Sequence, residues 1–455
     1  MSTKLDIINP ATEEQIASVA VHDLDATNRA IDLASKVAPA WRRVTPVDRS
    51  RLLRRFADVV DAHLEELAQL EVANSGHTIS NARWEAGNVR DVLMYYSGAP
   101  ERHSGRQIPV AGGVDITFYE PLGVVGIIVP WNFPMPIAGW GLGPALAAGN
   151  TVVLKPATLT PLTALRLGEL ALEAGLPEGV FQVVTGDGTM VGRRFVTHPA
   201  IRKVCFTGSN AVGRVIMEGC AEQVKRVTLE LGGKSANIIF DDADLEKAAA
   251  SAPYAVFDNA GQDCCARSRL LVEASAYERF MTLFEPAVKA VKVLDPTSDS
   301  SEMGPLITAA QRDTVRSYVD ESDVAFCGSA PEGPGYWMAP TVLETSNRKS
   351  RAFQEEIFGP VVSVVRFKDE AEAIAIANEG PYGLSGSIWS RDIGRALRVA
   401  RGVETGTLSV NSNSSVRYST PFGGFKQSGL GRELGPDALL GFSEEKNVFI
   451  ATEES

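Results

Sequence analysis

Apolar residues recur every three to four positions near the start of the chain, behind Thr45-Pro46-Val47-Asp48. A hydroxyl residue followed by proline and an acidic residue is typical of a helix N-terminus. The spacing predicts one surface helix with a buried apolar stripe, and the pairs Arg54-Arg55 and Glu65-Glu66 fall on its solvated side. The stripe comprises Leu52, Leu53, Phe56, Val59, Val60, Leu64 and Leu67.

From about residue 120 the pattern changes to short apolar runs that alternate with helical stretches. The continuous run Val124 to Val129 is typical of a strand buried on both faces. This β–α alternation predicts a parallel sheet covered by helices on both faces. Further strands are expected at 151–154, 180–184, 203–206 and 227–230, with a helix from Leu162 to Ala174 that stops at Gly175.

A second alternating block follows, and no long Pro/Gly/Ser linker or internal repeat separates it from the first. Two α/β blocks that pack tightly, with a cleft between them, are therefore expected. In this block we expect strands at 236–240, 270–272 and 361–367 and helices at 244–251, 277–291 and 370–378.

Composition narrows the function classes. The 455 residues carry 44 Lys+Arg against 56 Asp+Glu, a net charge of −12, which argues against nucleic acid as the main partner. Five cysteines make no disulfide scaffold and indicate a reducing, cytoplasmic setting. The start Met1 to Asp6 lacks a signal-peptide core, the acidic end Glu453-Glu454-Ser455 carries no lipidation box, and no apolar run is long enough for a membrane span.

Two adjacent cysteines, Cys264 and Cys265, are the first candidates for chemistry. Taken alone, such residues are more typical of small buried apolar groups than of a nucleophile. No Cys or His stands nearby at zinc-ligand spacing, so no metal site is expected. A nucleophilic thiol needs a positioned base, and Glu230, which closes a buried run before Gly232-Gly233, is the candidate; no histidine is well placed.

Six motifs occur in order between residues 130 and 426, and the matching segments extend from Asn9-Pro10-Ala11-Thr12 to Gly429-Leu430-Gly431-Arg432-Glu433, almost the whole chain. Together they closely resemble those of the NAD(P)-dependent aldehyde dehydrogenase superfamily. The six are Pro130-Trp131-Asn132-Phe133-Pro134, Phe206-Thr207-Gly208-Ser209, Leu229-Glu230-Leu231-Gly232-Gly233-Lys234, Gly261-Gln262-Asp263-Cys264, Glu355-Glu356-Ile357-Phe358-Gly359-Pro360 and Pro421-Phe422-Gly423-Gly424-Phe425-Lys426.

The resemblance implies oxidation of an aldehyde to a carboxylic acid. Cys264 would attack the carbonyl, and the Asn132 amide with the Cys264 backbone N–H would stabilise the oxyanion. Hydride transfer would leave a thioester on Cys264, and Glu230 would activate the water that hydrolyses it. Relatives that pass the acyl group to coenzyme A commonly lack this glutamate, so the free acid is favoured here.

The cofactor would be NAD or NADP. Gly208 and Ser209, between a strand and the following helix, are the expected pyrophosphate site. Gly186-Asp187-Gly188 with Gly192 departs from the usual dinucleotide fingerprint and is expected to be a loop. By resemblance, Lys155 would contact the adenosine ribose, and Glu356, with Phe358 beside it, would hold the nicotinamide ribose.

Thr158 is a departure from many NAD-preferring relatives, which carry glutamate at this position. Threonine removes the repulsion of a 2′-phosphate, and Lys155 can neutralise that phosphate. We expect NAD to be slightly preferred as the cofactor, with NADP as the alternative.

The substrate is a small aldehyde, and the resemblance places Phe133, Trp140 and Phe422 in an apolar entrance tunnel. Asp258 and Asp263 flank the nucleophile segment. They either favour a cationic aminoaldehyde or are hydrogen-bonded within their loop.

The expected fold is aldehyde dehydrogenase-like α/β, with a Rossmann-type cofactor domain, an α/β catalytic domain and a small β oligomerisation appendage. The resemblance implies a homodimer or homotetramer in which the strand 444–450 joins a neighbour's sheet; a local edge strand is the alternative. The expected cofactor domain comprises residues 1–102 and 121–231, and the expected catalytic domain comprises 232–435. The expected appendage comprises 103–120 and 436–455.

Two other functions compete with this interpretation. A thioesterase-like or esterase activity of Cys264 and Glu230 would need none of the cofactor residues. A catalytically silent binding protein on the same fold would need neither Asn132, Glu230 nor Cys264. The presence of both sets of residues favours the dehydrogenase.

Overall fold

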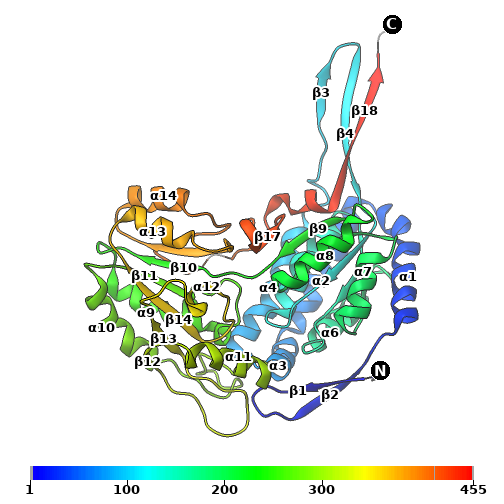
Figure 1. Ribbon diagram of the computed structural model, residues 1–455. Coiled ribbons are helices and arrows are strands. Elements are labelled where there is room, and N and C mark those ends of the chain that lie inside the picture. Colours follow the sequence, from blue (N-terminus) through cyan, green and yellow to red (C-terminus); the bar gives the residue numbers. More distant parts are fainter. Residues whose placement is uncertain (1–3, 415, 453–455) are drawn as a thin grey trace.

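The structure is a computed structural model that describes residues 4–414 and 416–452, so residues 1–3 and Glu453-Glu454-Ser455 lie outside it. Its first sheet has the strand order β17-β9-β8-β5-β6-β7, with every pair parallel except the antiparallel β17–β9 pair (Figure 1). The strands are β5 (Val124–Ile128), β6 (Thr151–Lys155), β7 (Phe181–Val183), β8 (Ile201–Thr207), β9 (Arg226–Glu230) and β17 (Gly429–Leu430).

Helices cover both faces of this sheet because its strands are apolar on both sides. In β5, Val125 and Ile127 join one core while Val124 and Ile128 join the other. One face carries α2 (Pro46–Ala62), α4 (Ile79–Ser97), α5 (Pro134–Ala147) and α6 (Leu162–Glu173), and the other carries α1 (Leu24–Arg42), α7 (Arg193–Thr197) and α8 (Asn210–Ala221). The predicted parallel sheet is confirmed.

Two local predictions were wrong. The stripe from Leu52 to Leu67 belongs to two helices, because α2 ends at Ala62 and α3 (Leu64–Ser75) begins after His63. The expected loop at 186–192 contains a π-helix, η1 (Gly188–Gly192), whose N-cap Asp187 accepts a hydrogen bond from Met190 N.

The second sheet has the order β12-β13-β14-β11-β10-β15-β16, and only the β12–β13 pair is antiparallel among the described strands. The strands are β10 (Ala236–Ile239), β11 (Arg269–Glu273), β12 (Val324–Cys327), β13 (Thr341–Glu344), β14 (Val361–Phe367), β15 (Gly386–Trp389) and β16 (Ser409–Val410). The helices are α9 (Leu245–Phe257), α10 (Tyr277–Lys289), α11 (Ala309–Asp320), α12 (Arg351–Gln354), α13 (Glu370–Ala377) and α14 (Ile393–Gly402), with the 3₁₀ turns η2 (Asp258–Gly261), η3 (Lys426–Ser428) and η4 (Pro436–Phe442).

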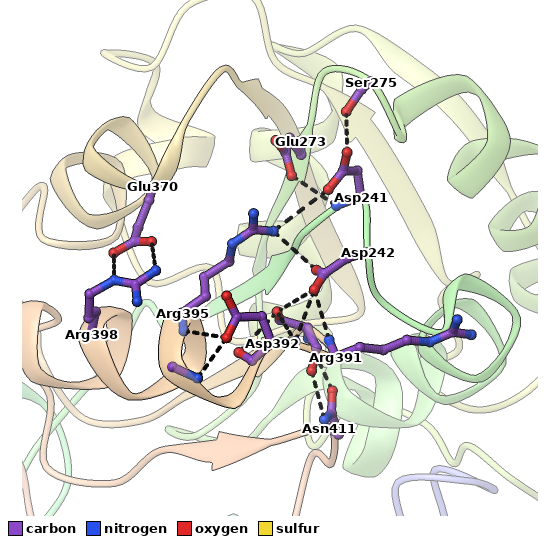
Figure 2. A network of polar contacts seen from close by, with 12 residues as sticks. Asp241, Asp242, Glu273, Ser275, Glu370, Arg391, Asp392, Arg395, Arg398 and Asn411 are labelled. Carbon is purple, nitrogen blue, oxygen red and sulfur yellow. Dashed lines mark hydrogen bonds and ion pairs between the residues drawn. The ribbon is translucent and has the colours of Figure 1, made fainter.

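One carboxylate ties the end of this second sheet to its outer helix. Asp242 follows β10 and accepts hydrogen bonds from Ser390 Oγ at 2.9 Å and from the backbone N–H groups of Arg391 and Asp392 at 3.1 and 3.0 Å (Figure 2). Arg395 on α14 adds a contact at 3.1 Å. Asp242 thus holds the loop between β15 and α14.

A third sheet, in the order β18-β4-β3, stands away from the body of the molecule (Figure 1). It consists of β3 (Gln107–Val110), β4 (Gly113–Pro121) and the C-terminal strand β18 (Ser443–Ala451), which pairs antiparallel with β4 along its whole length. The expected hairpin with a returning strand is present within one chain. A separate antiparallel pair, β1 (Lys4–Ile8) and β2 (Gln15–Ala20), begins the fold.

The two large blocks share one apolar core, in which Cys265, Leu384 and Phe422 pack with residues of α4 and α5. This contact agrees with the expected tight packing. Across residues 4–414 and 416–452, no helix has the length and apolar character needed to cross a membrane. The domain limits 1–102 with 121–231, 232–435 and 103–120 with 436–455 stay a prediction.

Candidate active site

The loop that carries Cys264 begins where α9 ends. Asn259, Ala260 and Gly261 have φ values of 50°, 53° and 69°, in the left-handed region. A side chain at Gly261 would place its Cβ 2.0 Å from the carbonyl oxygen of Gly359, so only glycine fits there. For a residue such as Ala260 this conformation costs roughly 1–2 kcal/mol, which the surrounding packing must offset.

Hydrogen bonds hold this loop against its neighbours. Gln262 Oε1 accepts from Ile307 N at 2.9 Å, and Asn259 Nδ2 donates to the carbonyl of Asn132 at 2.8 Å. The Asp263 carboxylate accepts from Cys265 N at 2.8 Å. The backbone around Cys264 is therefore fixed against two neighbouring segments and within its own loop.

Cys264 is partly exposed, whereas Cys265 is buried. A hydrogen bond with the Cys265 thiol and burial, with further contributions from nearby acidic groups, raise the pKa of the Cys264 thiol well above its usual range. At neutral pH the resting group is the thiol, so a base must remove its proton before it can attack.

Glu230 is the last residue of β9 and is 2% exposed. Neither of its carboxylate oxygens has a hydrogen-bond partner within the described residues. Burial, and after it the nearby charge of Glu433, raise the pKa of Glu230 well above its usual range. A carboxyl group in this state is poised to take part in proton transfer near neutral pH.

Asn132 follows β5 and is 4% exposed. Its side-chain Nδ2 donates to the carbonyl of Gln262 at 3.0 Å, which links the β5 loop to the Cys264 loop. One amide hydrogen suffices for that bond, and the second is available to another acceptor.

A cavity of about 330 Å³ opens beside these groups, and Cys264 and Glu230 both line it. The expected tunnel residues Phe133, Trp140 and Phe422 and the carboxylate of Asp258 line the same cavity, and the rings of Trp140 and Phe422 lie 5.1 Å apart. Asn132 is not part of the lining and reaches the site through Gln262.

Several lining residues had no motif to mark them in the sequence. They include Trp84 and Asn81 from α4, Tyr254 from α9, and Arg267. The spacing along α4 is that of an ordinary packed helix, so no local signal indicated that its end faces a site. Glu433 lies near Glu230 and raises its pKa, a contact that no local sequence pattern indicates.

A second feature of the site is the crevice at the carboxyl ends of the first sheet. From β5 the chain proceeds to β6 and β7 on one side, and later to β8 and β9 on the other. The strand order therefore reverses between β5 and β8, and such switch points are where doubly wound sheets bind dinucleotides. Asn132 follows β5 at this point, and Gly208 and Ser209 follow β8.

The N-terminus of α8 faces this crevice. Ser209 is its N-cap, and its Oγ accepts from Val212 N at 3.4 Å. Because α8 has 12 residues, its dipole and first N–H groups can bind an anionic pyrophosphate.

Two further expected cofactor residues lie at the end of β6 and in the loop after it. Lys155 is 4% exposed, and its Nζ donates to the carbonyl of Pro156 at 2.9 Å. Burial lowers the pKa of Lys155 to about 8, although the charge of Asp187 opposes this shift. Thr158 lies partly exposed in the loop after β6.

Glu356 and Phe358 come from the second block. Glu356 Oε1 accepts from Gly233 N at 2.9 Å, and burial raises its pKa to about 7. Phe358 has a left-handed backbone with φ of 57°, and its ring meets that of Trp131 at 5.2 Å. The carboxylate acceptor of Glu356, the ammonium of Lys155 and the helix N-terminus together fit the ribose and phosphate groups of a nicotinamide dinucleotide.

A thiol and a buried carboxyl group in one cavity, beside a dinucleotide crevice, define the class of a nicotinamide-dependent oxidoreductase with a cysteine nucleophile. Sequence comparison narrows this class, because the profile of the aldehyde dehydrogenase family matches residues 1–448. An aldehyde dehydrogenase of Emericella nidulans is 41% identical over 454 residues, covering 97% of this chain and 90% of its own.

Comparison with solved structures supports the same family. Betaine aldehyde dehydrogenase of Staphylococcus aureus, crystallised with NAD⁺, matches with a TM-score of 0.96 at 37% identity, covering 99% of this chain and 92% of its own. An NADP-dependent enzyme of E. coli matches with a TM-score of 0.96 at 38% identity, covering 98% of this chain and 95% of its own.

The chain belongs to the aldehyde dehydrogenase family. It is an NAD(P)-dependent oxidoreductase with the fold expected from the sequence.

Proposed function

We propose that this protein oxidises an aldehyde to the carboxylic acid through a thioester on Cys264. The observation that supports this most is that Cys264 and Glu230 line one cavity, which lies beside the crevice at the carboxyl ends of β5 and β8, where the strand order reverses. When NAD or NADP is bound, it supplies the hydride acceptor.

In the first half of the reaction, the Cys264 thiol gives its proton to Glu230 and its sulfur attacks the aldehyde carbon. A C–S bond forms, and negative charge moves to the carbonyl oxygen. The Asn132 amide and the Cys264 backbone N–H donate hydrogen bonds to that oxygen, which stabilises the transition state more than the ground state. Loss of hydride from the same carbon leaves the thioester.

In the second half, Glu230 first releases the proton from Cys264 to solvent, then accepts a proton from water while the hydroxide attacks the thioester carbon. The C–S bond breaks, the acid leaves, and the Cys264 thiolate regains its proton from Glu230. Burial of Glu230 without a hydrogen-bond partner among the described residues leaves its oxygens available to a water molecule. This step favours a free acid over acyl transfer to another thiol.

For the cofactor we propose that Gly208 and Ser209 bind the pyrophosphate, Lys155 and Thr158 border the adenosine ribose, and Glu356 with Phe358 hold the nicotinamide ribose. NAD is slightly preferred, because Asp187 reduces the positive potential of Lys155 toward a 2′-phosphate. Thr158 brings no negative charge, so NADP is accepted. A kcat/KM for NADP more than a hundredfold below that for NAD would contradict this acceptance.

The reaction is tested by absorbance at 340 nm with a broad aldehyde panel and either cofactor, comparing wild type with Cys264→Ala. We expect aldehyde-dependent reduction of the cofactor by wild type and none by the variant. Cys327→Ala, which removes an exposed thiol, is the matched control and retains activity. The absence of a signal across the panel would overturn the proposed function.

A further inference from the structure

The cavity beside Cys264 is lined by more carboxylate side chains than the proposed reaction requires. Asp258 and Asp263 line it together with Glu230. Oxidation of an aldehyde requires a nucleophile, a base and an oxyanion site, and none of these is Asp258. A carboxylate in a largely apolar cavity is costly unless it has a partner.

Asp258 is held in place by α4. Asn81 Nδ2 on α4 donates to its Oδ1 at 2.6 Å, and the charge of Asp258 raises the pKa of Tyr254 on α9. A carboxylate offers about four lone-pair sites, and this bond leaves most of them open. The side chain is thus fixed in direction and still able to accept hydrogen bonds from a ligand.

The cationic side chain that lines the cavity does not neutralise Asp258. Among the described lining residues, Arg267 is the one cationic side chain. It donates to the carbonyls of Cys265 and Asn413 at 2.6 and 3.1 Å, and its charge acts on Asp263. Asp258 therefore gives the cavity a residual negative potential.

Aromatic side chains line the same cavity as Asp258. Trp84 and Tyr254 line the cavity and are 51% and 65% exposed, which places them at its mouth. Phe133, Trp140 and Phe422 also line the cavity. The faces of such rings attract cations, and the attraction increases when water is excluded. A carboxylate combined with aromatic walls is the chemistry that selects an organic ammonium ion over a neutral or anionic group.

We propose that the preferred substrates are aldehydes that carry a primary ammonium group, with the ammonium donating to Asp258 while the aldehyde carbon meets Cys264. This deepens the proposed function and rests on it. The remaining lone pairs of Asp258 favour an N–H donor, and the rings stabilise the carbon chain and the charge.

The test compares substrates of equal size and different charge. In 3-aminopropanal the ammonium replaces the terminal methyl group of butanal, so the ratio of their kcat/KM values isolates the charge. We expect wild type to prefer 3-aminopropanal by about tenfold to a hundredfold. Succinic semialdehyde, which is anionic, should be the poorest of the three.

The matched variant is Asp258→Asn, which keeps the size and the bond to Asn81 while removing the charge. We expect its preference for 3-aminopropanal over butanal, the ratio of the two kcat/KM values, to fall below about threefold. Asp320→Asn, at an exposed residue of α11, should leave the preference unchanged.

The two proposals fail in different ways. Oxidation of butanal at a rate equal to or above that of 3-aminopropanal by wild type would overturn the ammonium preference and leave the dehydrogenase function intact. A preference that survives in Asp258→Asn would also overturn the role of Asp258. Failure of all three aldehydes, together with the broad panel, would overturn the dehydrogenase itself.

Discussion

Glu230 and Glu433 are two buried carboxyl groups that influence one another. Glu433 is 4% exposed, and burial raises its pKa to about 7; burial and the charge of Glu433 raise the pKa of Glu230 well above its usual range. Two like charges in a low-dielectric region disfavour each other, so both ionise less readily than in water. At the residue scale, burial and a neighbouring carboxyl group therefore raise the pKa of the proposed base.

Replacing Glu230 by Gln should separate the two halves of the reaction. In the variant, solvent water removes the thiol proton more slowly, so one equivalent of reduced cofactor still forms per site, and the thioester then persists because no base activates the water for its hydrolysis. We expect steady-state turnover to fall by about 10²- to 10⁴-fold. Mass spectrometry of the quenched enzyme should show the acyl group on Cys264.

Two controls accompany this prediction. Glu222→Gln at the exposed end of α8 should turn over as wild type does. Unchanged turnover of Glu230→Gln would contradict the assignment of the base.

The activity should rise with pH through the neutral range. The pKa values of Cys264 and Glu230 are both above their usual ranges, so below those values each unit of pH raises the ionised fraction about tenfold. We expect kcat at saturating substrate to increase from pH 6 to pH 9. In Glu433→Gln the rising limb should shift to lower pH, because a negative charge near Glu230 is removed. A flat profile in wild type would contradict this prediction.

At the scale of elements, short loops rather than helices fix the site. The Asp242 network illustrates how a single side chain positions one: the loop between β15 and α14 donates three of its polar hydrogens to Asp242 (Figure 2). Hydrogen bonds to a charged acceptor are stronger than neutral ones. A second pair, Glu370 with Arg398, ties α13 to α14 at 2.9 Å.

Asp242→Ala should therefore destabilise the second block. The variant leaves the N–H groups of Arg391 and Asp392 without their acceptor, at a cost of roughly 1–3 kcal/mol. Urea unfolding followed by circular dichroism measures the loss. Glu370→Ala, which removes an exposed ion pair, should cost under about 1 kcal/mol, and an equal effect of the two variants would contradict the role given to Asp242.

At the scale of the molecule, the appendage of β3, β4 and β18 projects away from the body of the protein (Figure 1). Its apolar side chains are unusually exposed, including Phe118 at 44%, Phe449 at 52% and Ile450 at 48%. In the described part of the chain, β18 pairs with β4 on one edge only. An apolar sheet with an open edge is suited to contact with a second copy.

We expect wild type to be a dimer or tetramer in solution and the double variant Phe449→Asp with Ile450→Lys to dissociate at low micromolar concentration, because charges would be buried at the contact. Light scattering after size-exclusion chromatography gives the mass. Leu172→Asp, at another exposed apolar residue, should not change it. A monomeric wild type would contradict this expectation.

The sequence by itself determined the parallel sheets and the reaction class. A continuous apolar run such as Val124 to Ile128 permits a strand covered on both faces and little else, since its residues feed both cores. The six ordered motifs identified the protein family. The helix break at His63 was not visible, because α2 and α3 bury the same side and their apolar spacing continues across it.

Only the tertiary structure decided which residues meet in the cavity. Asn81, Tyr254 and Asp258 come from α4, α9 and the turn after it, and Asn81 and Asp258 meet at 2.6 Å across 177 positions of sequence. Local periodicity reports which side of an element is buried, whereas such a meeting depends on how distant elements pack. For the same reason the raised pKa of Glu230 could not be foreseen, because it arises from burial and from Glu433 on a separate segment.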